Sequence, residues 1–194
     1  MELFDHAGHR LYLAADERAA FLDAAKTSPR EVRTFCHVLH DTGCRLSEAL
    51  ALPMRGVDLA GKVIVLETLK KRRRGVYRAV PVRPELLELL DMVHGVREAQ
   101  QRGKPETLDV RLWPWTRTHG WRLVKGIMAR AKIPDGPQKS PKGLRHGFGV
   151  AAISAGIPLN MLCKWMGHAS TETTAIYANA VGEEEQSIAA RMWG

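Results

Sequence analysis

The chain lacks the patterns that mark several large classes of protein. Its three cysteines, Cys36, Cys44 and Cys163, are too few and too widely spaced for a disulfide framework or a Cys-x-x-Cys zinc site. No apolar run approaches the roughly 20 residues that a membrane-spanning helix needs. The first residues show no basic-then-apolar export signal. We therefore expect a cytoplasmic protein without membrane contact.

Acidic residues are nearly absent from one long part of the chain. Between Val110 and Thr171 the single acid is Asp135, against ten lysines and arginines, and the same span holds four of the five tryptophans. The whole chain has a formal charge of +8 and an isoelectric point near 9.7. A base-rich, acid-poor segment of this length favours a polyanion as partner, most simply nucleic acid.

Periodicity predicts a mainly α fold with a small antiparallel β-hairpin, an α+β class. The β-branched stretches 62–67 and 76–82 read as the two strands. Most other segments have helical spacing, including one that Asp16 would cap, one ended by Gly43, and one from Thr116 with Trp121 in its apolar stripe. Residues 97–107 are polar and predict a surface excursion, and 178–194 predict a C-terminal helix.

One stretch combines a helix start with two cations. Ser140 suits an N-cap and Pro141 a first helical position. Apolar residues from Leu144 onward recur on one helix face, and Lys142 and Arg145 project from a neighbouring one. Amide dipoles and two cations therefore converge where an anion could bind.

A histidine and a tyrosine follow on short elements. Gly167 is placed to end a helix in the left-handed conformation, so His168 emerges at a corner. Tyr177 comes nine residues later, on a further short helix. A cationic pair, an imidazole and a phenol together suit chemistry on a phosphate.

These residues resemble the catalytic domain of the tyrosine recombinase (phage integrase) family. The resemblance rests on the segments Lys142–His146, Gly167–Ser170 and Ile176–Tyr177, and on an earlier arginine box, Thr42–Leu50. It extends from Tyr12 to Tyr177, nearly the whole chain. It implies the fold of that catalytic domain, which we expect to be a single domain over residues 1–194. Members usually carry a separate N-terminal domain, and here too few residues precede Arg45 for one, so the chain is either a minimal recombinase or a stand-alone piece.

The resemblance implies a site-specific DNA recombinase, of integrase, invertase or resolvase type. Tyr177 would attack a phosphodiester and form a 3′-phosphotyrosyl intermediate, without metal or cofactor. Arg45 and Arg145 would hold the phosphate, and His168 would contact the phosphate or place the tyrosine. Lys70, with Lys71 as alternative, would protonate the leaving 5′ hydroxyl. Further expected DNA contacts are Lys71, Arg72, Arg73, Arg74, Arg117, Arg122, Lys125 and Lys139.

The chain departs from the family pattern at Lys142, where a histidine is usual. A lysine accepts a proton near neutral pH only when its environment lowers its pKa, so Lys142 is either a base or a phosphate contact. His146 is interpreted as a buried scaffold histidine, and Glu48 as a scaffold partner for a neighbouring cation.

The expected partner is double-stranded DNA. On DNA we expect a homo-oligomer, a tetramer. Two points stay open: whether the free protein is a monomer, and whether accessory DNA-bending proteins take part. The resemblance also implies a prokaryotic, phage or mobile-element origin and a place on the nucleoid.

Three other functions stay open. A non-catalytic DNA-binding regulator could use the helix-turn-helix outline of Ala151–Met166. A type IB topoisomerase-like enzyme would carry the same residues and relax supercoils. A metal hydrolase built on His37, His40 and Asp41 ranks below both, because these residues lie in a helix with an ordinary apolar stripe.

Overall fold

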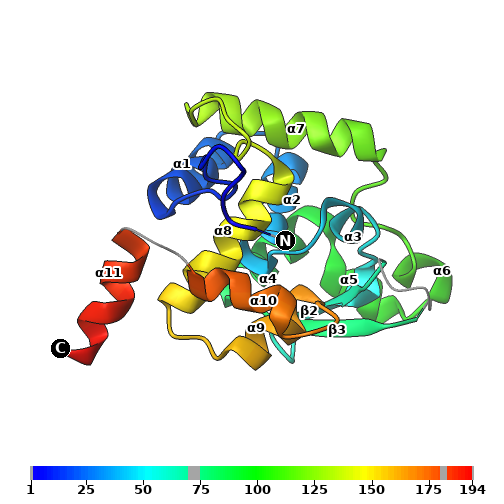
Figure 1. Ribbon diagram of the computed structural model, residues 1–194. Coiled ribbons are helices and arrows are strands. Elements are labelled where there is room, and N and C mark those ends of the chain that lie inside the picture. Colours follow the sequence, from blue (N-terminus) through cyan, green and yellow to red (C-terminus); the bar gives the residue numbers. More distant parts are fainter. Residues whose placement is uncertain (1, 70–74, 180–182, 194) are drawn as a thin grey trace.

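Helix α8 (Pro141–Ser154) is a central element of the fold. In the computed structural model, which describes residues 2–69, 75–179 and 183–193, it contacts α1, α2, α7, α9, η2 and α11. Figure 1 shows α7 along one side of the molecule, with the sheet, α9 and α10 on the other.

The fold is mainly helical with one small sheet, as the sequence predicts. The helices before the sheet are α1 (Ala15–Lys26), α2 (Arg30–Thr42), α3 (Leu46–Leu50) and the 3₁₀ turn η1 (Met54–Gly56). After the sheet come α4 (Pro84–His94), α5 (Val96–Arg102), α6 (Pro105–Leu108), α7 (Arg117–Arg130), α8, α9 (Leu159–Met166), α10 (Glu172–Ala175), η2 (Ile176–Asn179), α11 (Glu183–Ala189) and η3 (Ala190–Met192).

The predicted hairpin is present and gains a third, short strand. Strands β1 (Val57–Asp58), β2 (Val63–Glu67) and β3 (Tyr77–Pro81) are antiparallel in that order. Ile64 pairs with Val80, and Leu66 pairs with Arg78. Ile64, Leu66 and Val80 are buried, so one face of the sheet joins the core.

Two apolar clusters hold the helices. The larger surrounds Phe35 and Trp113, whose rings meet edge-on at 5.1 Å. The smaller lies at the other end of α8 and includes Tyr12, Met166 and Tyr177. Each cluster draws residues from distant parts of the sequence, so α8 is fixed on several sides at once.

The structure corrects four local expectations. Asp16 lies inside the first turn of α1, and the carboxylate of Glu17 instead accepts the backbone N–H of Ala14 at 2.9 Å. Residues 97–107 lie largely in α5 and α6 instead of forming an irregular excursion. Helix α8 is buried on most of its circumference, because it is central, and not along one face only. Trp121 is 46% exposed and lies outside the core.

None of the helices within the described residues is long and apolar enough to cross a membrane.

Candidate active site

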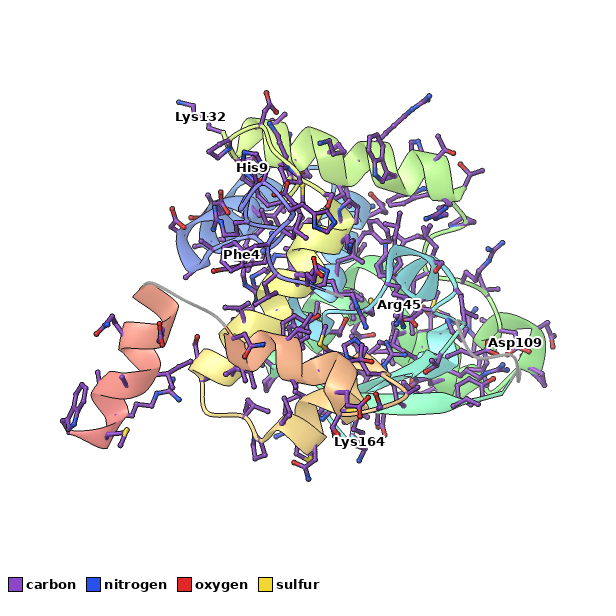
Figure 2. The ribbon with its side chains drawn as sticks, in the orientation of Figure 1. Phe4, His9, Arg45, Asp109, Lys132 and Lys164 are labelled. Carbon is purple, nitrogen blue, oxygen red and sulfur yellow. The ribbon has the colours of Figure 1, made fainter. Side chains whose placement is uncertain are left out.

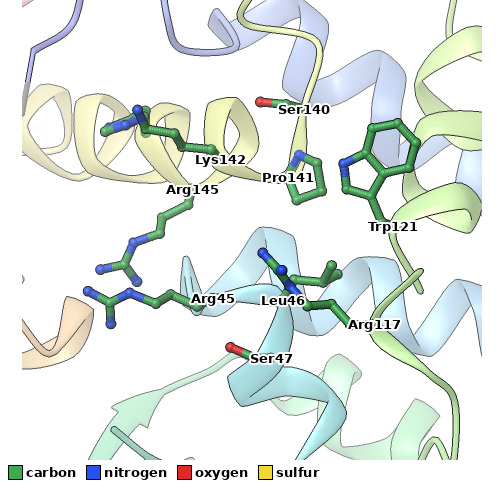
Figure 3. A pocket seen from close by; sticks show the side chains of 10 residues that line it. Arg45, Leu46, Ser47, Arg117, Trp121, Ser140, Pro141, Lys142 and Arg145 are labelled. Carbon is green, nitrogen blue, oxygen red and sulfur yellow. The ribbon is translucent and has the colours of Figure 1, made fainter. Parts of the chain in front are cut away.

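A cavity of about 360 Å³ opens where α3, α7 and α8 begin. It is lined by Arg45, Leu46, Ser47, Arg117, Trp121, Ser140, Pro141, Lys142, Arg145 and His146. Figure 3 shows Arg145, from α8, and Arg45, from the start of α3, extending in the same direction with their guanidinium groups close together. The N-terminal end of α8 borders the cavity, and its Ser140 cap accepts the backbone N–H of Gly143 at 3.0 Å. Four cationic side chains, Arg45, Arg117, Lys142 and Arg145, therefore border a space that could hold an anion.

Arg45 is positioned by a sharp corner between α2 and α3. Gly43 adopts φ +58°, and a Cβ at this position would lie 2.3 Å from the ring of Phe148. Glycine is therefore required both for the left-handed backbone and for the close approach of α8. The corner directs the half-buried Arg45 side chain into the cavity, where Nη1 donates to Glu48 at 2.8 Å.

Glu48 contacts both Arg45 and a buried arginine, Arg78, that the sequence interpretation missed. Its other carboxylate oxygen accepts from Arg78 at 2.6 Å, and Arg78 also donates to Thr68 and to the carbonyl of Trp165. Burial works to raise the pKa of Glu48, but the attraction and hydrogen bonds of Arg78 lower it below its ordinary value. The predicted scaffold role of Glu48 thus has a structural basis. An arginine in a strand gives no local signal of this contact, since its partner lies thirty positions earlier.

Arg145 is held rigidly while part of its hydrogen-bonding capacity is left over. Its side chain donates to the carbonyl of Gly43 at 2.7 Å, to the carbonyl of Met166 at 2.8 Å and to His168 at 2.9 Å. Burial, with the nearby charge of Arg45, lowers its pKa to about 10, so it stays cationic at pH 7. Of five guanidinium N–H groups, Nε and one on Nη1 make no hydrogen bond to a described residue. These two can serve a ligand in the cavity.

His168 has a defined tautomer. Arginine can only donate, so Nε2 of His168 accepts from Arg145, and Nδ1–H donates to Thr174 at 2.8 Å. Burial and the charges of Arg145 and Arg45 lower its pKa to about 3, so the ring is neutral at pH 7. The imidazole therefore acts as a rigid support for the Arg145 guanidinium.

Tyr177 lies next to the cavity but does not line it. The side chain is fully buried, its ring stacks on His168 at 6.3 Å, and its hydroxyl lies 3.1 Å from Nδ1 of His146. A Cβ on Gly149 would lie 2.5 Å from the tyrosine ring, so this glycine makes room for it. Burial raises the pKa of Tyr177 to about 12, although Arg145 and Arg45 oppose this.

The other predicted DNA contacts differ in their availability. Lys142 is exposed, and with Arg117 it lines the cavity. Arg122 is also exposed. The ammonium of Lys125 instead donates to the carbonyl of Lys139 at 2.7 Å, and Lys139 itself pairs with Asp135.

Lys70, Lys71, Arg72, Arg73 and Arg74 lie outside the described residues.

The bases of the segment 110–171 do not all lie on one side of the molecule (Figure 2). Figure 2 shows Lys132 and Lys164 at opposite sides of the molecule, with Arg45 between them. Arg130 donates to the carbonyl of Ala24 and so helps hold α7 on α1. Some of the bases that the charge pattern counted are therefore engaged in contacts within the protein.

The alternative metal site on α2 is occupied by internal contacts. Asp41 bonds His40 at 2.6 Å and Arg83 at 2.9 Å. Among the described residues no group of three or more His, Cys, Asp or Glu is arranged to hold a metal ion.

The chain is similar in sequence to known proteins. The model of the "Phage integrase family" matches residues 12–184. Tyrosine recombinase XerD of Mycobacterium tuberculosis is 30% identical over 150 residues, which are 75% of this chain and 46% of that protein.

Two solved structures share the fold. The XerA recombinase superposes with a TM-score of 0.75 at 22% identity, covering 94% of this chain and 65% of that one. The XerH site-specific recombinase, in a pre-cleavage complex with its difH substrate, gives 0.72 at 21% identity, covering 98% and 60%.

The chain spans about half the length of the curated relatives it matches. The family model nevertheless covers most of this chain, including all the residues that border the cavity, the histidine at the corner and the buried tyrosine. The chain belongs to the phage integrase family.

Proposed function

We propose that the chain is the catalytic part of a site-specific DNA recombinase, which cleaves and rejoins DNA through a 3′-phosphotyrosyl bond. The observation that carries this proposal is that Arg45 and Arg145 line one cavity. Tyr177 lies behind His146, which also lines the cavity and lies within hydrogen-bond distance of the tyrosine hydroxyl. A relative of the same fold was solved as a pre-cleavage complex with its DNA substrate, which supports DNA as the partner.

The two arginines bind the scissile phosphate. Arg45 and the two remaining N–H groups of Arg145 donate to its nonbridging oxygens and neutralise the charge that develops in the pentavalent transition state. Their geometry is fixed before DNA arrives, because Glu48 and His168 already hold them. Preorganised donors of this kind usually supply the largest part of the rate enhancement.

Tyr177 then attacks the phosphorus. Its Oη forms a bond to phosphorus as the bond to the 5′ oxygen breaks, and that oxygen takes a proton from Lys70, the acid that the family resemblance suggests. Lys142, exposed at the cavity, contributes a phosphate contact. Rejoining reverses these steps when a 5′ hydroxyl attacks the phosphotyrosyl bond.

Attack requires Tyr177 to turn toward the cavity, because its side chain is fully buried. It lies on η2, a single 3₁₀ turn between the short α10 and the residues before α11. So short an element can shift without unfolding the core. DNA bound at the cavity would favour the shifted state.

We also propose that the active form is a homo-oligomer on DNA, acting on cytoplasmic DNA. Met192 and Trp193 are 81% and 77% exposed at the C-terminal end, an apolar pair that a second copy could cover. If deleting residues 184–194 leaves the solution mass and the cooperativity on DNA unchanged, this part of the proposal is wrong.

A nicked duplex whose cleaved end diffuses away tests the chemistry. The wild type should accumulate a covalent adduct, and Tyr177→Phe should bind the duplex equally well without forming one. An adduct with the Phe variant would show that another nucleophile acts.

The same experiment removes the regulator alternative, for which no adduct is expected. Two-site recombination, measured against relaxation of a supercoiled plasmid, separates a recombinase from a topoisomerase.

A further inference from the structure

His146 forms the wall between the cavity and the buried tyrosine. It lines the cavity beside Arg45, Lys142 and Arg145, yet only 1% of the residue is exposed. On its other side, Nδ1 lies 3.1 Å from the hydroxyl of Tyr177. The sequence interpretation of His146 as a scaffold residue accounts for its burial but not for this contact.

The hydroxyl of Tyr177 must lose its proton in the attack, and the groups near it differ in their ability to accept one. His168 stacks on the tyrosine ring, but Nε2 accepts from Arg145 and Nδ1–H donates to Thr174. Lys142 is a cation at the open side of the cavity. His146 is the described side chain whose ring nitrogen is within hydrogen-bond distance of the phenol.

We propose that His146 is a catalytic residue that accepts the hydroxyl proton of Tyr177 at Nδ1 as the tyrosine turns from its buried position toward the cavity, so that the phenolic oxygen can attack the phosphorus. The O–H bond breaks as the N–H bond forms, and the new Oη–P bond replaces the P–O5′ bond. The leaving oxygen takes its proton from the separate acid of the proposed mechanism. The proton on His146 returns to Tyr177 when the strand is rejoined. This inference rests on the proposed function.

The charges around His146 suit an acceptor that DNA activates. Burial lowers the pKa of His146 to about 4, with Lys142 and Arg145 as further causes, so its ring is neutral and able to accept at pH 7. Lys142 and Arg145 from α8 and Arg45 from the α2–α3 corner all border the cavity. A phosphate among these cations offsets their charge and so favours the protonated imidazole. The N-terminal amino group is a further cause that lowers the pKa of His146. His168 and Tyr177, two titratable side chains near the ring, are neutral at pH 7.

The position of His146 on α8 explains how it could replace the usual histidine. Lys142 and His146 are four residues apart and therefore share one face of the helix. Lysine at the first position supplies charge to the phosphate, and histidine one turn later supplies the proton acceptor. The two tasks are thus divided between neighbouring residues.

Single-turnover cleavage of the nicked duplex tests the inference. His146→Asn keeps a hydrogen-bonding group near the position of Nδ1 but cannot take up a proton. We expect it to slow adduct formation by about 10²- to 10⁴-fold, with duplex affinity and melting temperature close to those of the wild type. His6→Asn, an exposed histidine far along the chain, is the matched control and should be unaffected. An adduct in the wild type together with an undiminished rate in His146→Asn would overturn the inference alone, whereas no adduct in the wild type would overturn the proposed function.

A second pair of measurements separates proton acceptance from packing. Replacing Tyr177 by a fluorotyrosine, whose phenol is more acidic, should restore part of the lost rate in His146→Asn, which a purely structural defect would not allow. In the intact protein, ¹⁵N-histidine NMR should find Nδ1 of His146 unprotonated and its shift altered by Tyr177→Phe. A protonated Nδ1 at pH 7, or no rescue, contradicts the inference even if one variant fails to fold.

Discussion

Replacing Glu48 by glutamine should lower the free energy of unfolding, and the contacts of Glu48 decide by how much. Its side chain is fully buried and accepts from Arg45 Nη1 at 2.8 Å, Arg78 Nη2 at 2.6 Å and the backbone N–H of Arg45 at 2.9 Å. Glu48→Gln keeps the size but points an amide N–H at one of these donors. Removing one partner of a buried pair costs about 3–5 kcal/mol. Arg45 is 23% exposed and can regain water, whereas Arg78 is 5% exposed and cannot, so we expect about 3 kcal/mol, the lower end of that range.

Urea unfolding at pH 7, followed by tryptophan fluorescence, measures this loss. For a chain of this length about 3 kcal/mol corresponds to a fall in melting temperature of roughly 6–12 °C. The control is Glu88→Gln, an exposed glutamate on α4, which should change stability by less than about 0.5 kcal/mol. A Glu48→Gln protein within about 1 kcal/mol of the wild type would refute the assignment of Glu48 as the anchor of both arginines.

The pH dependence gives an independent check with a fixed sign. Arg78 holds the pKa of Glu48 below its ordinary value of 4.5. The stabilisation is therefore complete at neutral pH and is lost as the pH falls below 4.5 towards the lowered pKa. The difference in the free energy of unfolding between wild type and Glu48→Gln should shrink over that range. A difference that stays constant down to pH 3 contradicts the proposed charge interaction.

Three further predictions follow from packing and charge. Gly149→Ala places a methyl group 2.5 Å from the Tyr177 ring, so it should lower stability by about 1–3 kcal/mol and disturb adduct formation. Gly126→Ala, with open space around it, should stabilise α7 by about 0.5–1 kcal/mol. Thermal melting and adduct yield test both variants. Arg117→Gln should weaken DNA binding on all sequences and reduce the slope of log affinity against log salt by about 0.9. A fluorescence titration measures this slope, and an unchanged slope would show that Arg117 does not contact a phosphate. Trp113→Ala should lower the free energy of unfolding in urea by about 3–5 kcal/mol, because the ring is fully buried. Trp193→Ala, at a residue that is 77% exposed, should change it little, and equal effects would contradict the described core.

The helices and the hairpin could be predicted from the sequence because their signals are local. Gly43 and Gly167 end α2 and α9 in the left-handed conformation, and Ser140 with Pro141 starts α8, as expected. Where a local rule had competitors, it failed. Asp16 loses the cap position of α1 because Glu17 reaches back to the backbone of Ala14. Trp121 is exposed because it borders the cavity, which no periodicity reveals.

The sequence by itself determined which side chains are candidates for the chemistry, because the arginine, histidine and tyrosine motifs are read from neighbouring residues. Only the tertiary structure decided how these side chains are held. The contact of Arg78 with Glu48, the three acceptors around Arg145 and the approach of His146 to Tyr177 all join residues at least twenty positions apart. The physical reason is that hydrogen bonds and burial act over a few ångströms of space, whereas sequence patterns record only distance along the chain.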